Sequence, residues 1–264
     1  MNIAVCIKQV PDTADLRIDP ETNTLIREGV AAVMNPLDEF ALEAALQLRD
    51  AAGASAVTAF TMGPLQAQDV LRKAVATGAD NAVLVSDRAF AGSDTWATSL
   101  TLARAIEATG TFDLILTGKQ AVDGDTAQVG PGIATHLGWP QVTYVTRVEY
   151  REPGMLRVTR MLEHAKAELD VRLPAVLTVL KEANEPRLPS LAGRLRSMRI
   201  KPQVLNAAAI GVSAGELGLA GSPTRVVKIA VPNVSRAHRR IDGSVEEIAR
   251  QLAAELRESA GNLK

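Results

Sequence analysis

A polar loop in the middle of the chain combines residue types that could do chemistry. Residues 118–131 read GKQAVDGDTAQVGP, and two aspartates, Asp123 and Asp125, are separated there by a single glycine. Lys119 and Gln120 come just before them. Two carboxylates can form an acid/base pair or bind a metal ion, and a glycine-rich loop can bind the phosphate of a nucleotide. The loop therefore presents three alternatives.

The order of residues within the loop argues against the first two. No histidine is next to the aspartates, and aspartates in a glycine turn commonly bond the backbone instead. Calcium is disfavoured because D-G-D lacks the remaining ligand series and the terminal glutamate of an EF-hand loop. We predict that Asp125 accepts a hydrogen bond from the N–H of Ala127 or Gln128 as the N-cap of the following helix.

The glycines of the loop favour a nucleotide. Gly124, Gly130 and Gly132 would let the backbone approach a ligand closely. The loop is not a dinucleotide fingerprint of the G-x-G-x-x-G type, because Pro131 removes a donor where that motif needs backbone contact. From the residues alone, we predict a nucleotide-binding loop with no catalytic nucleophile.

The first half of the chain predicts the elements that position this loop. Short continuous apolar runs, typical of strands buried on both faces, occur at 3–8, 56–62, 81–86 and 113–118. Helix-length amphipathic segments lie between them, at 36–52, 65–78 and 92–108. This alternation predicts a doubly wound α/β fold with a mostly parallel sheet.

Four segments are expected to meet at one edge of this sheet, the edge where ligands bind in open parallel sheets. They are residues 6–8, 35–38, 61–64 and 118–129. Some of them begin helices, whose first N–H groups and positive dipole end favour phosphate. Each segment alone could be an ordinary strand-to-helix turn, so it is their convergence that favours a binding site.

The pattern changes after about residue 140. Residues 141–152 and 155–163 predict two amphipathic strands around the turn Pro153-Gly154, and 167–180 adds a further extended pair. From about residue 184 the alternation of strands and helices stops, and 203–240 shows little periodicity.

The end of the chain predicts an amphipathic helix. Ser244 and Glu247 form a capping box at its start. Its apolar stripe consists of Ile248, Leu252, Ala253 and Leu256. We therefore divide the chain into an α/β nucleotide-binding domain, residues 1–183, and a loop with a C-terminal arm, residues 184–264. The arm has no sheet of its own, so it must pack back on the first domain or wrap a second chain.

Composition narrows the class of protein further. The chain has 264 residues, 47% of them apolar, and a net charge of −1, which predicts a globular fold without general attraction to nucleic acid. Its one cysteine, Cys6, excludes an intrachain disulfide and fits a cytoplasmic setting. One cysteine and three scattered histidines make a structural zinc site improbable, and no apolar run approaches the ~20 residues that span a bilayer.

Several stretches taken together resemble the β subunit of electron transfer flavoproteins. They spread over residues 3–196 and read IKQVPD, MNPLDEFALEAAL, LRKAVATGAD, LTGKQAVDGDTAQVGP, LPAVLTV and NEPRLPSL, with a GP after the second strand. The resemblance extends to the bifurcating and nitrogen-fixation-associated group. It implies a heterodimer with an α subunit whose C-terminal domain holds the electron-transferring FAD, and an adenine nucleotide in this chain.

The resemblance also implies which residues contact that nucleotide. They are Cys6, Asn35, Pro36, Leu37, Asp38, Met62, Gly118, Lys119, Gln120, Ala121, Val122, Asp123, Gly124, Asp125, Thr126, Ala127, Gln128 and Val129. The family divides into members whose β subunit holds AMP and members in which it holds a second FAD. The sequences DGDTAQVGP and GLAGSPTRVVKI resemble those of the second group, so we expect FAD, with AMP as the alternative.

A loop that grips partner dehydrogenases or a quinone reductase is implied as well. It corresponds to NEPRLPSL, with Leu191 as the anchor and Arg187 and Pro189 beside it. This sequence departs from the family at 162–165, which reads LEHA where an acidic residue followed by two glycines is common. That change puts the local backbone in question.

Two other functions stay open at the level of sequence. One is a homodimeric, regulatory adenine-nucleotide-binding module with no redox role. The other is a hydrolase that uses Asp123 and Asp125.

Overall fold

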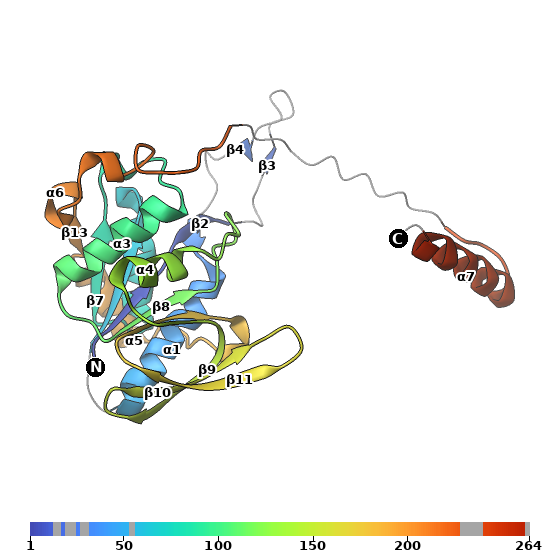
Figure 1. Ribbon diagram of the computed structural model, residues 1–264, viewed down its shortest axis with the longest axis horizontal. Helices are drawn as coiled ribbons and strands as arrows, with labels where there is room; N and C mark the ends of the chain where they lie inside the picture. Colours follow the sequence, from blue (N-terminus) through green and yellow to red (C-terminus); the bar gives the residue numbers. More distant parts are fainter. Residues whose placement is uncertain (13–16, 19–24, 27–31, 53–55, 228–239, 262–264) are drawn as a thin grey trace. The chain divides into compact units, whose positions relative to one another are not determined.

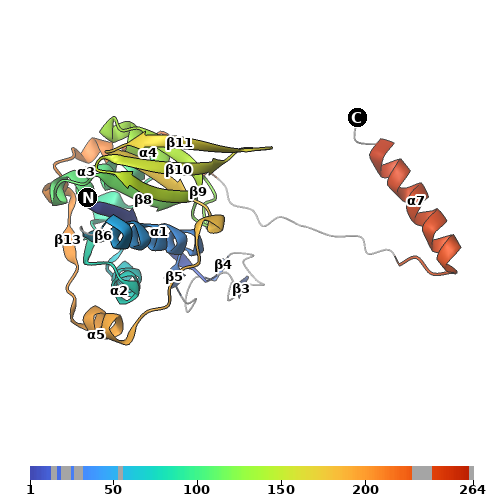
Figure 2. The same ribbon diagram turned by 90° about the horizontal axis from the view of Figure 1, so that it is seen from below.

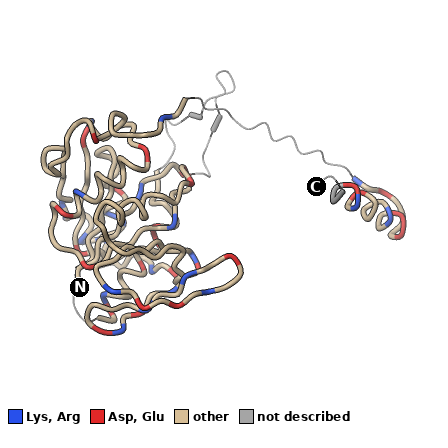
Figure 3. The backbone as a smooth tube through the Cα atoms, viewed as in Figure 1, with Lys and Arg blue, Asp and Glu red and all other residues tan. Residues whose placement is uncertain are grey.

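The computed structural model describes residues 1–12, 17–18, 25–26, 32–52, 56–227 and 240–261. They fall into two compact units, Met1–Val227 and Lys228–Lys264. Charges of both signs are interspersed along the described chain (Figure 3).

A nine-stranded sheet forms the centre of the first unit (Figure 1). Its order is β11-β10-β9-β12-β8-β1-β6-β7-β13. The strands are β1 (Ile3–Cys6), β6 (Val57–Met62), β7 (Asn81–Val85), β8 (Leu114–Gly118), β9 (Gln141–Glu152), β10 (Met155–Met161), β11 (Lys166–Arg172), β12 (Ala175–Val179) and β13 (Gln203–Leu205). All neighbours from β9 to β13 in this order pair in parallel, and only β10 runs against its neighbours.

Helices cover both faces of the sheet, as the alternating pattern predicts. The face with α1 (Pro36–Ala52) and α2 (Gln68–Thr77) shares one apolar core, and the face with α3 (Thr95–Thr109) and α4 (Val129–Leu137) shares another (Figures 1 and 2). Aliphatic residues fill most of both cores, since aromatics make up only 3% of the chain. The predicted α/β fold with a mostly parallel sheet is confirmed.

The antiparallel extension forms where the hairpin was predicted. β10 pairs with β9 across the turn at Pro153-Gly154 and with β11 on its other side. The β10–β11 turn closes without the family's glycines, because the N–H of Leu162 donates to the carbonyl of Ala165 at 2.8 Å. Two further strand pairs are small: β2 (Gln9–Pro11) with β5 (Ala32–Met34), and β3 (Arg17–Ile18) with β4 (Leu25–Ile26).

The segment after residue 184 belongs to the first unit up to Val227, and it contains a strand that the sequence did not indicate. β13 pairs in parallel with β7 at the edge of the sheet, and its three residues are too few to show a periodicity. Two short helices flank it, α5 (Leu191–Arg199) and α6 (Ala207–Ile210). Asp94 fastens the end of the segment by accepting from the N–H of Thr224 at 2.9 Å.

The second unit contains the predicted C-terminal helix, α7 (Val245–Gly261). Its capping box is confirmed, because the N–H of Ser244 donates to Glu247 at 2.9 Å and the Ser244 hydroxyl lies 3.4 Å from the N–H of Glu247. Leu252 and Leu256 in its apolar stripe are exposed. Across the described residues, no helix has the length and apolar character needed to cross a membrane.

Candidate functional site

The order of the strands reverses at β1, and this reversal places the candidate site. The chain runs from β1 outwards through β6 and β7, and then returns to set β8 on the other side of β1. The helix α1 lies on one face of the sheet and α4, which follows β8, lies on the other. Such a switch point leaves a crevice beyond the carboxyl ends of the two strands, where open α/β sheets bind ligands.

Asp38, in the first turn of α1, joins the ends of β1 and β8. Its buried carboxyl accepts from the N–H of Lys8 at 2.7 Å and from the N–H of Gly118 at 3.1 Å. A Cβ at Gly118 would overlap the Asp38 carboxyl and lie 2.7 Å from the carbonyl carbon of Leu37. Glycine is therefore needed here for the close approach of strand and helix.

Asn35 fixes the polar loop against the same helix start. Its fully buried side chain donates to the carbonyl of Gln120 at 2.9 Å and accepts from the N–H of Val122 at 3.1 Å. Its own N–H donates to the carbonyl of Lys8 at 2.8 Å. An asparagine suits this position because its side chain both donates and accepts. The first half of the 118–129 loop is thus held by partly buried hydrogen bonds.

Burial governs ionisation in the crevice. It raises the pKa of Asp38 to about 7, although the N–H groups of Lys8 and Gly118 and the side chain of Asn35 lower it. Burial, with the charge of Asp38, raises the pKa of the Cys6 thiol to about 12. Cys6 is therefore a protonated thiol at neutral pH, and a thiol is a poor nucleophile.

The second half of the loop is exposed and differs from the sequence prediction. Asp123 forms an ion pair with Lys8 at 2.7 Å, and Asp125 accepts from the side chain of Gln120. Asp125 and Ala127 have φ values of 53° and 54°, the left-handed region that non-glycine residues seldom adopt. The prediction that Asp125 caps α4 is wrong, because this backbone turns its carboxylate towards Gln120.

The start of α4 is consequently uncapped. Its N-cap residue is Gln128, which makes no side-chain hydrogen bond to the helix and instead accepts from the Thr95 hydroxyl at 2.8 Å. By contrast, Asp94 caps the neighbouring helix α3 through the N–H groups of Trp96 and Ala97. The first N–H groups of α4 and its positive dipole end remain available to an anion.

Two of the three glycines predicted to admit a ligand serve packing instead. A Cβ at Gly130 would lie 2.6 Å from the side chain of Thr178, and one at Gly132 would lie 2.7 Å from Cβ of Ser99. These glycines let α4 approach the sheet and α3. Only Gly124 has open space around it, with no heavy atom within 4 Å of an added Cβ.

The remaining predicted contacts lie at the same edge. Pro36 and Leu37 begin α1, and Met62 ends β6, the neighbour of β1. The ammonium of Lys119 lies 5.2 Å from the ring centre of Tyr144. The sequence did not predict that Tyr144 lies beside this loop. Its φ of 59° falls at an irregularity in β9, and such an irregularity leaves no local pattern in the sequence.

The predicted partner residues lie elsewhere, on the segment that ends at the start of α5. The side chain of Leu191 is 77% exposed. Arg187 points back to α1, where it forms ion pairs with Glu43 at 2.8 Å and Asp50 at 3.1 Å. Pro189, which lies between Arg187 and Leu191 in the sequence, is half-buried.

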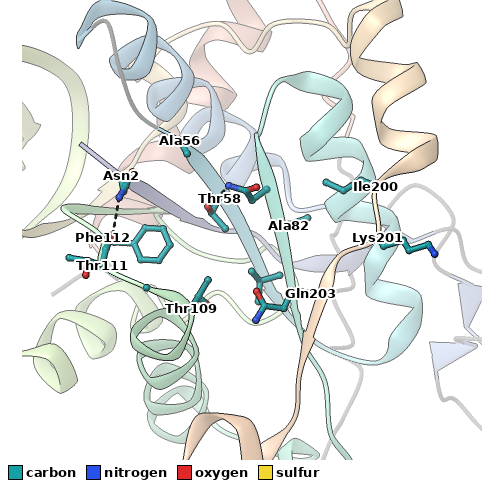
Figure 4. A pocket seen from close by; sticks show the side chains of 13 residues that line it. Asn2, Ala56, Thr58, Ala82, Thr109, Thr111, Phe112, Ile200, Lys201 and Gln203 are labelled. Atoms are coloured by element: carbon teal, nitrogen blue, oxygen red, sulfur yellow. Dashed lines mark hydrogen bonds between the residues drawn. The ribbon is translucent and has the colours of Figure 1, made fainter.

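A separate polar cavity of about 410 Å³ opens at the opposite end of the sheet (Figure 4). Its lining includes Asn2, Thr58, Asn81, Gln203 and Lys201, from the amino ends of the strands and the approach to β13. None of the residues predicted to bind a ligand lines this cavity, and amino ends are not the usual ligand edge of a parallel sheet.

Comparison with known proteins identifies the class. The model of the electron transfer flavoprotein domain matches residues 22–210. The electron transfer flavoprotein subunit beta of Thermoanaerobacterium thermosaccharolyticum is 49% identical, over 97% of this chain and 98% of the relative. Protein FixA of Azorhizobium caulinodans is 47% identical, over 97% and 94% respectively. The chain belongs to the electron transfer flavoprotein family.

Within that family it is similar to the beta subunits, so the resemblance seen in the sequence is confirmed. A further relative, the caffeyl-CoA reductase-Etf complex subunit CarD of Acetobacterium woodii, is 45% identical over 98% of both chains.

Proposed function

We propose that this chain binds an adenine nucleotide in the crevice between β1 and β8, and that it transfers electrons only in a heterodimer with an α subunit. One observation supports this most directly. Asn35 and Asp38 hold the 118–129 loop across the switch point of the sheet, beside the uncapped start of α4. The flavin supplies the redox chemistry, and the protein supplies position and electrostatics.

Within the crevice, the backbone is the main ligand-binding group. The N–H groups at the start of α4 face the phosphate, and the open space at Gly124 gives access to the loop. Lys8 adds a positive charge and is free to move from Asp123 to a phosphate, since the pair is exposed. Cys6 and Met62 provide apolar contact at neighbouring strand ends. No side chain needs to act as a nucleophile.

The nucleotide proposed here is a second FAD, which makes the heterodimer a candidate for electron bifurcation; AMP is the alternative. Support comes from the resemblance of the loop sequence to that of the members with a second FAD, and from the similarity to FixA and CarD. The test is to co-express the chain with its α subunit, denature the complex and quantify the released nucleotides. Two FAD per heterodimer is the expected result, and one FAD with one AMP would exclude the second flavin.

An Asn35→Ala variant adds a control for the location of the nucleotide. The variant loses the partly buried hydrogen bonds to Gln120 and Val122, so we expect it to lose the nucleotide of this chain and keep the FAD of the α subunit. A nucleotide retained at full occupancy would place the site elsewhere. A folded homodimer that binds ATP or AMP and forms no complex with the α subunit would favour the regulatory alternative.

Residues 184–264 are proposed to make the protein contacts, with Leu191 docking a dehydrogenase or quinone reductase and the arm with α7 wrapping the α subunit. The exposure of Leu191 and of the α7 stripe supports both roles. A small apolar anchor gives fast and reversible docking. Leu191→Ala should slow electron delivery to the partner and leave the flavin spectrum unchanged; an altered spectrum would indicate a structural role.

A further inference from the structure

The docking segment, residues 184–199, presents apolar side chains that make few contacts of their own. Leu188, Leu191, Leu195 and Met198 are each at least half exposed. The segment is nevertheless held at two points on helices of the α/β unit. The contacts that hold the docking segment therefore determine the orientation of its exposed apolar side chains.

The first point is Glu43, in the middle of α1. Its carboxylate is 4% exposed and accepts from Arg187 three times: from Nε at 2.8 Å, from the second guanidinium nitrogen at 3.0 Å, and from the backbone N–H at 3.1 Å. Two parallel N–H donors fix both the distance and the orientation of a guanidinium. Nearby, Asn184 donates to the carbonyl of Phe40 on the same helix at 2.9 Å.

The second point is the carboxyl end of α2, on which α5 rests. Arg196 donates to the carbonyls of Val75 at 3.2 Å and Ala79 at 2.7 Å. A Cβ at Gly193 would overlap the carbonyl of Ala76, so α5 lies against α2 with no room for a side chain between them. Positively charged groups also suit the negative end of a helix dipole.

We propose that Glu43 is a positioning residue for partner docking: its pairing with Arg187 holds the 184–190 loop so that Leu191 is presented in one orientation. This inference rests on the proposed docking role of Leu191. A loop that is already ordered loses less conformational freedom when it binds, so the anchor strengthens docking without touching the partner. Glu43 also shares the helix α1 with Asp38, and Asn35 directly precedes this helix, so one rigid element links the docking segment to the proposed nucleotide site.

The test uses the heterodimer with its α subunit and the variant Glu43→Gln. The probe is a purified flavoprotein reductase of the caffeyl-CoA type that the wild-type heterodimer reduces with saturation kinetics. We expect KM for this protein to rise about tenfold, with kcat within twofold of wild type. Reduction of a small dye, which needs no docking, should be unchanged. Glu39→Gln is the matched control, because Glu39 is also a carboxylate on α1 but pairs with Lys73 on α2 rather than with the docking segment.

A double-mutant cycle with Leu191→Ala separates positioning from general damage. If Glu43 acts through Leu191, adding Glu43→Gln to Leu191→Ala should raise KM no further. A raised KM with Leu191→Ala and an unchanged KM with Glu43→Gln would overturn the inference and leave the docking role intact. If neither variant changes KM, the docking role of Leu191 fails, and the inference fails with it.

A second variant covers the case in which Glu43→Gln does not fold. Arg187→Lys keeps the charge opposite the buried carboxylate and loses the paired donors, so we expect a KM increase in the same direction. Loss of dye reduction in this variant, or a KM equal to that of wild type, would contradict the proposal.

Discussion

At each end of the parallel sheet, an aspartate side chain accepts one or more hydrogen bonds from backbone N–H groups. The two aspartates differ in whether a positive charge also compensates the carboxylate. At the carboxyl end, the buried Asp38 accepts from two backbone N–H groups and has no ion pair within 4.0 Å among the described residues. At the amino end, Asp80 accepts from the N–H of Val57 at 2.9 Å and pairs with Arg49 at 3.1 Å. Its side chain is 33% exposed.

This difference indicates that the amino end of the sheet is built for stability and that the carboxyl end is built to bind a ligand. At the amino end, arginines compensate the carboxylate and donate to the carbonyls of Gly78 and Ala79 just after α2, so the local charges are already matched. At the carboxyl end, the carboxyl pKa is raised by burial and a helix start is left uncapped. Shifted ionisation and unmatched polar groups concentrate at functional sites. Changing Asp80 at the amino end should therefore affect stability alone, whereas changing the buried contact between Asp38 and Gly118 at the carboxyl end should also affect nucleotide binding.

The largest expected effect is that of Gly118→Ala at the carboxyl end. The added Cβ would lie 2.7 Å from the carbonyl carbon of Leu37 and 2.9 Å from the backbone nitrogen of Asp38, and backbone cannot move aside cheaply. We expect the free energy of unfolding to fall by about 3 kcal/mol and the bound nucleotide to be lost. Denaturant unfolding and nucleotide release measure the two effects.

Gly124→Ala is the matched control in the same loop. Nothing lies within 4 Å of its added Cβ, so we expect a change in stability within about 0.5 kcal/mol. Equal losses for the two alanines would mean that the crowding at Gly118 is relieved by movement of the loop.

At the amino end, Asp80→Ala should cost stability without affecting nucleotide content. The change removes the acceptor of the Val57 N–H and one of the two carboxylates that pair with Arg49, a loss of about 2 kcal/mol for hydrogen bonds to a charged group. Urea unfolding of the purified heterodimer, followed by nucleotide quantification, checks both statements. Release of the nucleotide would erase the distinction between the two edges.

Asp38 predicts a pH dependence specific to the carboxyl end. Its pKa is raised from 3.8 to about 7, so between these values the unfolded chain loses a proton that the folded chain keeps. Stability therefore falls as pH rises through this window, by about 1.4 kcal/mol per pH unit, and levels off above it. In nucleotide-free protein, the stability difference between wild type and Asp38→Asn should shrink with that slope from pH 5 to pH 6. Parallel curves for the two proteins would contradict it.

The comparison also marks what the sequence could predict. Four apolar runs and the helices between them predicted correctly which segments meet at one edge, because the topology of a parallel sheet brings its carboxyl ends together. The contacts that hold the crevice could not be read in the same way. Gly118 meets Asp38 from 80 positions away, and Arg187 meets Glu43 from 144 away, so neither pair has a local pattern.

Errors arose where a local rule competed with the fold. Asp125 has the residue type and spacing of an N-cap, but its left-handed φ sends its carboxylate to Gln120. Gly130 and Gly132 look like ligand-facing glycines and instead allow α4 to pack closely. β13 has three residues, and a strand that short gives no periodic signal.

The smallest expected effect is that of Asp123→Asn, on the exposed side of the crevice. Its ion pair with Lys8 joins two partly exposed side chains, and such pairs contribute less than about 1 kcal/mol. We expect that small loss of stability to disappear at high salt, because exposed charges are screened. The released Lys8 should keep the nucleotide at least as well as in wild type. Loss of the nucleotide would instead assign Asp123 to the ligand, and a hydrolytic turnover abolished by this change would favour the hydrolase alternative.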